Sequence, residues 1–193
     1  MKHYQQTKHY TCDPACLMMA MHCLGKRRKM VKAMEMQLWK EANLRTVQGC
    51  LPQGLALSAI KRGFHAEITC KKEHFCETTS KDNVSIEVAK RQLNECIKHG
   101  VKINYKMPGI KDIKEALSNG GVPLLLVNSF RIHGIKSPHW IVVTGIDNQS
   151  VSINDPYNKH GKDVQVKRED LLQMMDDLER YSEIGKRMLL LSK

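Results

Sequence analysis

One cysteine near the start of the chain has the surroundings that a nucleophile needs. Cys12 opens an apolar run and follows Thr11, a residue type favoured just before the first turn of a helix. A thiol in that turn faces unpaired backbone N–H groups and the positive end of the helix dipole, which favour the nucleophilic thiolate. Cys12 is therefore a candidate nucleophile, and it requires a base, a group that orients this base and donors for an oxyanion.

The base and its orienting group are predicted on a hairpin near the end of the chain. Segments 139–146 and 151–155 predict two strands, and the alternation of apolar residues places His139 and Asp155 on the apolar face of each. These faces coincide only if the loop has an odd length, for example 147–149, or if a strand contains a bulge. The register of the hairpin is therefore a check on the assignment of His139 as the base and Asp155 as its orienting group. Asn154 is the alternative orienting group.

An oxyanion donor is predicted six residues before the cysteine. The side-chain amide of Gln6 and the backbone N–H of Cys12 would together stabilise a developing negative charge. Gln5 adjoins Gln6, and only the spacing to Cys12 favours Gln6. Loss of one such donor typically lowers turnover by about a hundred- to a thousandfold.

These motifs resemble the papain-like cysteine peptidases of the C39 type, especially their stand-alone C39-like branch. That family has Gln, five residues and Cys-Gly-Pro-Ala, then His-Trp-Val-Val-Val-x-Gly and Asn-Asp-Pro. This chain has Gln6, then Cys12-Asp13-Pro14-Ala15, then His-Trp-Ile-Val-Val-Thr-Gly at 139–145 and Asn154-Asp155-Pro156. Segments 38–42 and 61–64 also resemble family sequence, so the likeness covers about residues 4–157.

The resemblance implies a papain-like α+β fold, in which a helix bearing the cysteine packs on an antiparallel sheet bearing the histidine and the aspartate. It also implies a cysteine peptidase acting on a peptide or protein substrate through Cys12, His139, Asp155 and Gln6. Asp13 departs from the family pattern, which has Gly there. A carboxylate at this position would stabilise the start of the helix but oppose thiolate formation.

Two other functions use the same residues or the same fold. An acyl or peptidyl transferase would pass the acyl group to an amine or thiol, as phytochelatin-synthase-like relatives of this fold do. A non-catalytic domain would hold a peptide in the cleft. Such domains usually lose the cysteine or the histidine, and both are present here, which favours the enzyme.

The remaining motifs do not indicate a metal or another cofactor. His9, Cys12, Cys16 and His22 suggest zinc, but no second pair with ligand spacing follows, so we expect no metal. Trp140 is expected in the core or the wall of the site. His133 and His160 lie in glycine-containing loops and are expected to face solvent.

The length and the net charge restrict the number of domains and the class of partner. The 193 residues fit one domain spanning 1–193, with 41% hydrophobic and 26% charged residues. The net charge of +11 includes a basic group at 26–29, but only 5% of residues are aromatic and no nucleic-acid-binding motif is present. We therefore expect a solvated basic surface rather than nucleic-acid binding. Between these two, the charge could instead attract an acidic substrate or partner.

The ends and the cysteines of the chain indicate where it acts. No segment is apolar enough to cross a membrane, and the first residues lack the apolar core of a secretory signal. The seven cysteines show no framework spacing, which favours reduced thiols. We expect a cytoplasmic protein, with signal-less secretion as the alternative.

Helices are expected first and most strands later, which is typical of an α+β domain. A helix runs from Cys12 to a stop at Gly25. Further helices are predicted at 30–42, 55–60, 86–97, 112–117 and 169–180, and strands at 64–69, 101–105, 123–127, 139–146, 151–155, 164–166 and 187–191.

Overall fold

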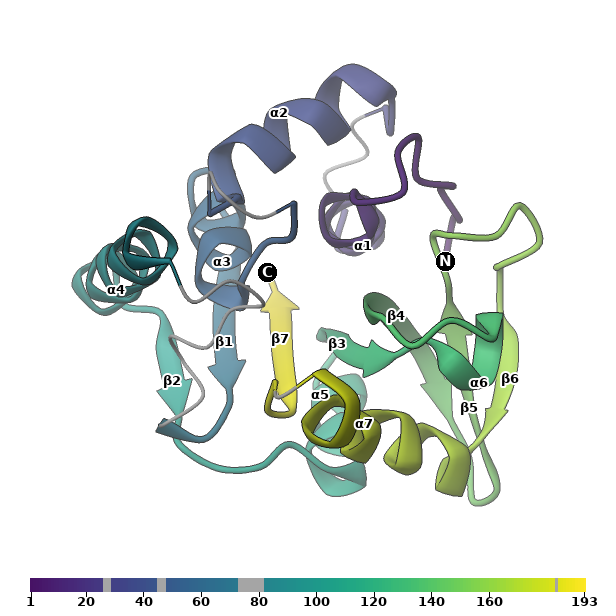
Figure 1. Cartoon of the computed structure of the whole chain (residues 1–193). Helices are drawn as coiled ribbons and strands as arrows, with labels where there is room; N and C mark the ends of the chain where they lie inside the picture. The colour runs from purple at the N-terminus through teal and green to yellow at the C-terminus, as the bar shows by residue number, and fades with distance from the viewer. Residues whose placement is uncertain (26–28, 45–47, 73–81, 183) are drawn as a thin grey trace.

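A seven-stranded sheet forms the framework of the fold. In the computed structural model, which describes residues 1–25, 29–44, 48–72, 82–182 and 184–193, the strand order is β2-β1-β7-β3-β4-β5-β6 (Figure 1). Neighbouring strands are antiparallel except β1 and β2, which are parallel. The strands are β1 (His65–Thr69), β2 (Lys102–Asn104), β3 (Val122–Asn128), β4 (Pro138–Ile146), β5 (Ser150–Asn154), β6 (Val164–Lys167) and β7 (Arg187–Ser192).

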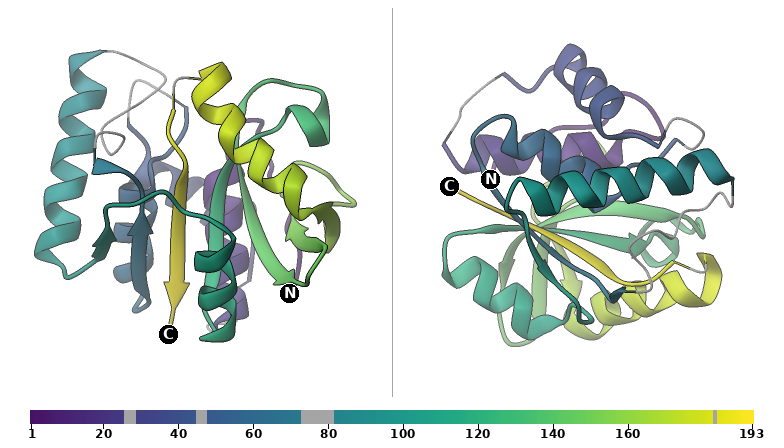
Figure 2. Two further views of the ribbon diagram at one scale, coloured as in Figure 1. Left: turned by 90° about the horizontal axis from the view of Figure 1, so that it is seen from below. Right: turned by 90° about the vertical axis from the view of Figure 1, so that its left-hand side faces the viewer.

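Helices cover both faces of this sheet, as the right-hand view of Figure 2 shows. The first four helices lie on one side, and α5 and α7 lie on the other. The helices are α1 (Cys12–Cys23), α2 (Lys32–Ala42), α3 (Pro52–Ile60), α4 (Asn83–Lys98), α5 (Ile110–Ser118), α6 (Phe130–His133) and α7 (Arg168–Ser182). The predicted α+β class is confirmed.

Strand β3 lies at the centre and divides the hydrophobic core into two layers. Leu124 and Leu126 pack with residues of α1 and α3, whereas Leu125 and Val127 pack with residues of α5 and α7. Both faces of the strand are therefore buried, which explains why its sequence is continuously apolar rather than alternating.

The sequence pattern misses one helix, and some segments that it addresses lie outside the described residues. Helix α6 lies in the 129–138 segment, which was expected to be a loop, and its four residues are too few for a helical period to show. Most of the basic group at 26–29, and Cys76, lie outside the described residues.

The described cysteines are six free thiols. No helix within the described part of the chain is both long enough and apolar enough to cross a membrane.

Candidate active site

The β4–β5 hairpin contains a bulge, one of the two irregularities that the assignment of His139 and Asp155 requires. Val143 pairs with Ile153, but the next pair is Gly145 with Ser152, so one extra residue lies on β4. This bulge shifts the register by one residue, and as a result His139 and Asp155 lie on the same side of the sheet. Without it they would lie on opposite sides.

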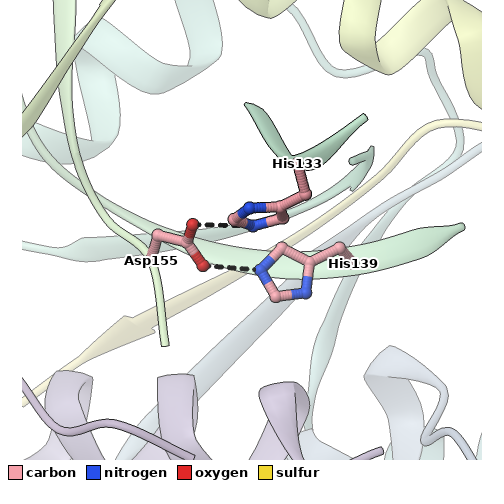
Figure 3. A group of neighbouring side chains, drawn as sticks. All are labelled: His133, His139 and Asp155. Atoms are coloured by element: carbon pink, nitrogen blue, oxygen red, sulfur yellow. Dashed lines mark hydrogen bonds and ion pairs between the residues drawn. The ribbon is translucent and has the colours of Figure 1, made fainter. Parts of the chain in front are cut away.

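His139 and Asp155 are in direct contact. The Nε2 atom of His139 and the Oδ1 atom of Asp155 are 2.8 Å apart, and their side chains are only 7% and 6% exposed. Figure 3 shows that the other ring nitrogen of His139 points away from the carboxylate. That nitrogen, Nδ1, is the one left to exchange a proton with another group.

The backbone of Asp155 is held from two sides. Its N–H donates to the carbonyl of Gly161 at 2.8 Å, and its carbonyl lies 2.8 Å from Nε2 of His3. Oδ1 also accepts the N–H of Tyr157 at 2.9 Å. The neighbouring Asn154 is engaged elsewhere, because its Oδ1 accepts a hydrogen bond from the N–H of Asp163.

A second histidine contacts the same carboxylate (Figure 3). Nε2 of His133 lies 2.8 Å from Oδ2 of Asp155, within ion-pair distance, although its ring N–H is not aligned for an ideal hydrogen bond. The His133 side chain is only 9% exposed, so the expectation that it faces solvent is wrong. The short helix α6 carries it over Asp155, and no spacing in the sequence signals this placement.

The charge of Asp155 is stabilised by these neighbours. Burial by itself would raise its pKa, but the contacts with His133, His139 and the N–H of Tyr157 outweigh burial and hold the pKa below its usual range. Asp155 is therefore ionised at neutral pH between two imidazole rings.

Cys12 lies at the start of α1, as predicted, and α1 packs against the face of β4 that carries Trp140 and Val142. The backbone N–H groups of Trp140 and Asp13 point to the Cys12 sulfur, and the thiol of Cys16 lies 3.2 Å from the carbonyl of Trp140. Trp140 is 3% exposed and belongs to the core, as expected. The backbone of Trp140, which directly follows His139 on β4, thus contacts the first two turns of α1.

The surroundings of the Cys12 thiol differ from the expectation. The residue keeps some exposed surface, but burial of the thiol and then the charge of Asp13 raise its pKa well above the usual value. The N–H groups of Trp140 and Asp13 lower the pKa, but not by enough to cancel the burial. The prediction that the first helical turn favours the thiolate is therefore wrong for this state of the site.

Gln6 is half-buried, whereas Gln5 is exposed. The backbone N–H of Gln6 donates to the carbonyl of Pro156 at 2.8 Å, next to Asp155. The Nε2 atom of Gln6 donates one hydrogen to the carbonyl of Lys8 at 2.7 Å, which leaves its second N–H available. Gln5 is exposed, and its amide lies 3.5 Å from the carbonyl of Tyr157.

Glu35 anchors the segment that carries Gln6. This fully buried carboxylate accepts hydrogen bonds from the Tyr4 hydroxyl at 2.9 Å, and from the N–H and hydroxyl of Thr7 at 2.8 and 2.7 Å. It also accepts the hydroxyl of Thr11, which lies at the predicted cap position but makes no side-chain capping bond. Helix α2 thus fixes both the Gln6 segment and the start of α1.

One group of side chains within the described part of the chain could hold a metal ion. His133, His139 and Asp155 each offer a ligand atom, and these atoms lie within 4.8 Å of one another. The His9, Cys12, Cys16 and His22 set is not such a group. Without a metal, the two Nε2 atoms each lie 2.8 Å from one oxygen of the Asp155 carboxylate.

His139 and Asp155 are in direct contact. The Cys12 thiol contacts the backbone of Trp140, which follows His139, and the backbone N–H of Gln6 donates to the carbonyl of Pro156, which follows Asp155. A solved structure described as a C39-like peptidase from Bacillus anthracis is similar in fold, with a TM-score of 0.52 at 14% identity, covering 100% of this chain and 94% of that one. The peptidase domain of Streptococcus ComA, a bifunctional ABC transporter, gives a TM-score of 0.49 at 17% identity, covering 98% and 97%.

No curated protein matches the chain. A family model described as the Peptidase_C39 like family matches residues 1–190, which is nearly the whole sequence. The chain therefore belongs to the Peptidase_C39 like family.

Proposed function

We propose that this chain is a cysteine peptidase that hydrolyses a peptide or isopeptide bond, with Cys12, His139 and Asp155 as its triad and Gln6 as an oxyanion donor. The observation that carries the proposal is the 2.8 Å contact between Nε2 of His139 and Oδ1 of Asp155. An ionised carboxylate can only accept, so this contact supports a hydrogen on Nε2 of His139. In the proposal, the Nδ1 lone pair then takes the proton of the Cys12 thiol.

In the proposed reaction, Nδ1 of His139 takes the proton of the Cys12 thiol. The sulfur attacks the substrate carbonyl carbon, and the resulting oxyanion is bound by the Gln6 amide and the backbone N–H of Cys12. When the carbon–nitrogen bond breaks, His139 gives its proton to the leaving amine. Water then attacks the thioester while His139 takes its proton, which releases the carboxylic acid and restores the thiol.

The substrate is proposed to be a peptide or protein. The net charge of +11 would attract an acidic segment by long-range electrostatics. If an amine or thiol replaced water in the second step, the same residues would catalyse acyl transfer.

The raised pKa of the Cys12 thiol favours a second candidate, a peptide-binding domain without catalysis. Burial and the Asp13 charge both keep Cys12 protonated in the absence of a substrate. In an enzyme, the proton would pass to His139 as the substrate binds, so a thiol that is neutral at rest remains compatible with catalysis.

The first test is alkylation with limiting iodoacetamide at pH 6, read by intact mass and peptide mapping. Cys23 is exposed and serves as the internal reference. The enzyme is supported if Cys12 reacts faster than Cys23, if labelling disappears in Cys12→Ala, and if it slows in His139→Ala. Cys23→Ala is the matched control and should not change the rate at Cys12.

Because a thiol that is neutral at rest is compatible with catalysis, labelling is repeated in the presence of a peptide library. Labelling of Cys12 no faster than that of Cys23 in both states, with no peptide cleaved, would favour the binding domain. A peptide-library screen should then be read by binding to the wild-type protein. Selective labelling would instead justify a screen for hydrolysis, with added amines or thiols to detect transfer.

A further inference from the structure

We propose that His133 is a positioning residue of this site, which holds the Asp155 carboxylate so that its Oδ1 atom faces His139. The inference rests on the proposed function, because it assigns His133 a part in keeping His139 ready to accept a proton. It concerns a residue that contacts Asp155 and that neither the motifs nor the comparisons assign.

The two oxygens of Asp155 have different partners. Oδ1 faces Nε2 of His139 at 2.8 Å and the N–H of Tyr157 at 2.9 Å. Oδ2 faces Nε2 of His133 at 2.8 Å. A carboxylate held at only one oxygen can rotate about its Cβ–Cγ bond, whereas contacts at both oxygens fix its plane.

The His133 ring is itself held in place by two aromatic neighbours. Its centroid lies 5.4 Å from that of His139, with the planes at 81°, and 4.6 Å from that of Tyr157. Edge-to-face and tilted packing of this kind restricts the ring without using its nitrogens. The Nε2 atom of His133 therefore stays directed at the carboxylate.

The backbone of α6 is fixed well enough to position this ring. Ser129, which precedes α6, donates two hydrogen bonds to the far end of the loop, from its N–H to the carbonyl of Ser137 and from its hydroxyl to the carbonyl of Ile135. Gly134 ends α6 with a φ of +71°, a conformation that glycine adopts readily. Arg131 of α6 forms an ion pair of 2.9 Å with Asp170 of α7.

The electrostatics of Asp155 agree with this role. Burial would raise its pKa, and contact with His133 comes first among the effects that oppose burial. Removing this contact would leave Oδ2 buried and would weaken the negative charge that the Nε2–H of His139 faces. A weaker partner at Nε2 would let the hydrogen of His139 move to Nδ1, the position needed to accept the thiol proton.

The test compares His133→Gln with His133→Phe. Glutamine keeps an N–H donor within reach of Oδ2, whereas phenylalanine keeps a ring but has no donor. The same two substitutions at His99, an exposed residue at the end of α4, are the matched controls. The first readout is nitrogen NMR of histidine-labelled protein, which reports the tautomer of each ring without requiring activity.

The expected result is that His139 carries its hydrogen on Nε2 in the wild type and in His133→Gln, and shows both tautomers in His133→Phe. Alkylation of Cys12 should slow by about 10- to 100-fold in His133→Phe and by about threefold or less in His133→Gln. Rescue by glutamine separates positioning from a merely structural role.

Two results would overturn the inference. One is an unchanged His139 tautomer in His133→Phe. The other needs no variant and applies even if His133→Phe does not fold: a wild-type His133 whose hydrogen lies on Nδ1, so that Nε2 has nothing to donate to Asp155. If the wild type cleaves no peptide and Cys12 stays unreactive with peptide present, but the tautomers follow the expected pattern, the proposed peptidase fails while the positioning role stands.

Discussion

Oδ2 of Asp13 accepts a hydrogen bond of 2.5 Å from the backbone N–H of Cys50, 37 residues further along the chain. This bond ties the first turn of α1 to the segment before α3. The other oxygen, Oδ1, is buried and has no hydrogen-bond partner among the residues that the structure describes. Where the resembling family has glycine, this chain therefore has a buried carboxylate that joins α1 to the segment before α3, next to the candidate nucleophile.

The first prediction concerns the pH dependence of stability. Burial raises the pKa of Asp13 from 3.8 to about 7, so the folded protein keeps a proton that the unfolded chain loses near pH 4. The free energy of unfolding should therefore fall as pH rises from about 4 to 7, by at most about 1.4 kcal/mol per pH unit from this group. Asp13→Asn should remove this component, as measured by urea unfolding at pH 5 and pH 8.

The same substitution should also affect the nucleophile. Without the Asp13 charge, the Cys12 thiol should lose its proton more readily, and alkylation at pH 8 should accelerate. Asp163→Asn, at a residue with a 46% exposed side chain, is the control and should change neither property. An Asp13→Asn protein with the pH profile and Cys12 reactivity of the wild type would contradict this account.

The second prediction concerns Asp155. Because its pKa in the folded protein lies below the usual value, its contribution to stability is fully present above about pH 4, the pKa of the carboxyl in the unfolded chain. The contribution is lost as the pH falls below about 4 toward the pKa of the folded state. Asp155→Asn should flatten this acid limb of the stability profile. It should also slow Cys12 alkylation or peptide hydrolysis by about 10²- to 10⁴-fold, because His139 loses its orienting charge. Asn154→Ala, which leaves the His139 contact intact, should keep far more activity.

The third prediction concerns the space beside Asp155. A Cβ atom on Gly161 would lie 2.0 Å from the carbonyl oxygen of Asp155, so Gly161→Ala must displace one of the two backbones. We expect a loss of about 1–3 kcal/mol in stability, together with slower Cys12 alkylation. Gly49→Ala adds the same methyl group where no atom of the described residues lies within 4 Å, and it should be nearly neutral. Equal melting temperatures for the two variants would refute the close approach.

The fourth prediction concerns the anchoring of the Gln6 segment. Glu35→Gln replaces one acceptor oxygen by a donor that faces the hydroxyls of Tyr4 and Thr7. The segment should loosen, and trypsin should cleave faster after Lys8. Glu41→Gln, which weakens the ion pair with Arg62, should not expose Lys8. Protection of Lys8 in both variants would show that Glu35 does not anchor the segment.

The sequence predicts the elements whose hydrophobic pattern is long enough to read. The fully buried strand β3 and the β4–β5 hairpin lie where the pattern indicates, and Cys12 begins α1. These features depend on local periodicity, helix start signals and the requirement that each apolar face be buried. A pattern of this kind needs no knowledge of distant contacts.

The features that the sequence misses depend on contacts between distant segments. His133 is buried because α6 lies over Asp155, 22 residues later, and four residues of helix give no period to detect. The burial of Asp13 depends on Cys50, and the hydroxyl of Thr11 binds Glu35 instead of capping α1. The rise in the pKa of Cys12 follows from this packing, which a helix-dipole argument does not include.

The extra residue in β4 makes the site sensitive to the number of residues between His139 and Asp155. Deleting Thr144 would restore regular pairing and turn the two side chains toward opposite layers of helices, although every residue of the proposed triad would still be present. An alignment that scores only the identities of those residues would not detect this loss. The length of the intervening segment is therefore as informative as the residues themselves when other chains are compared with this one.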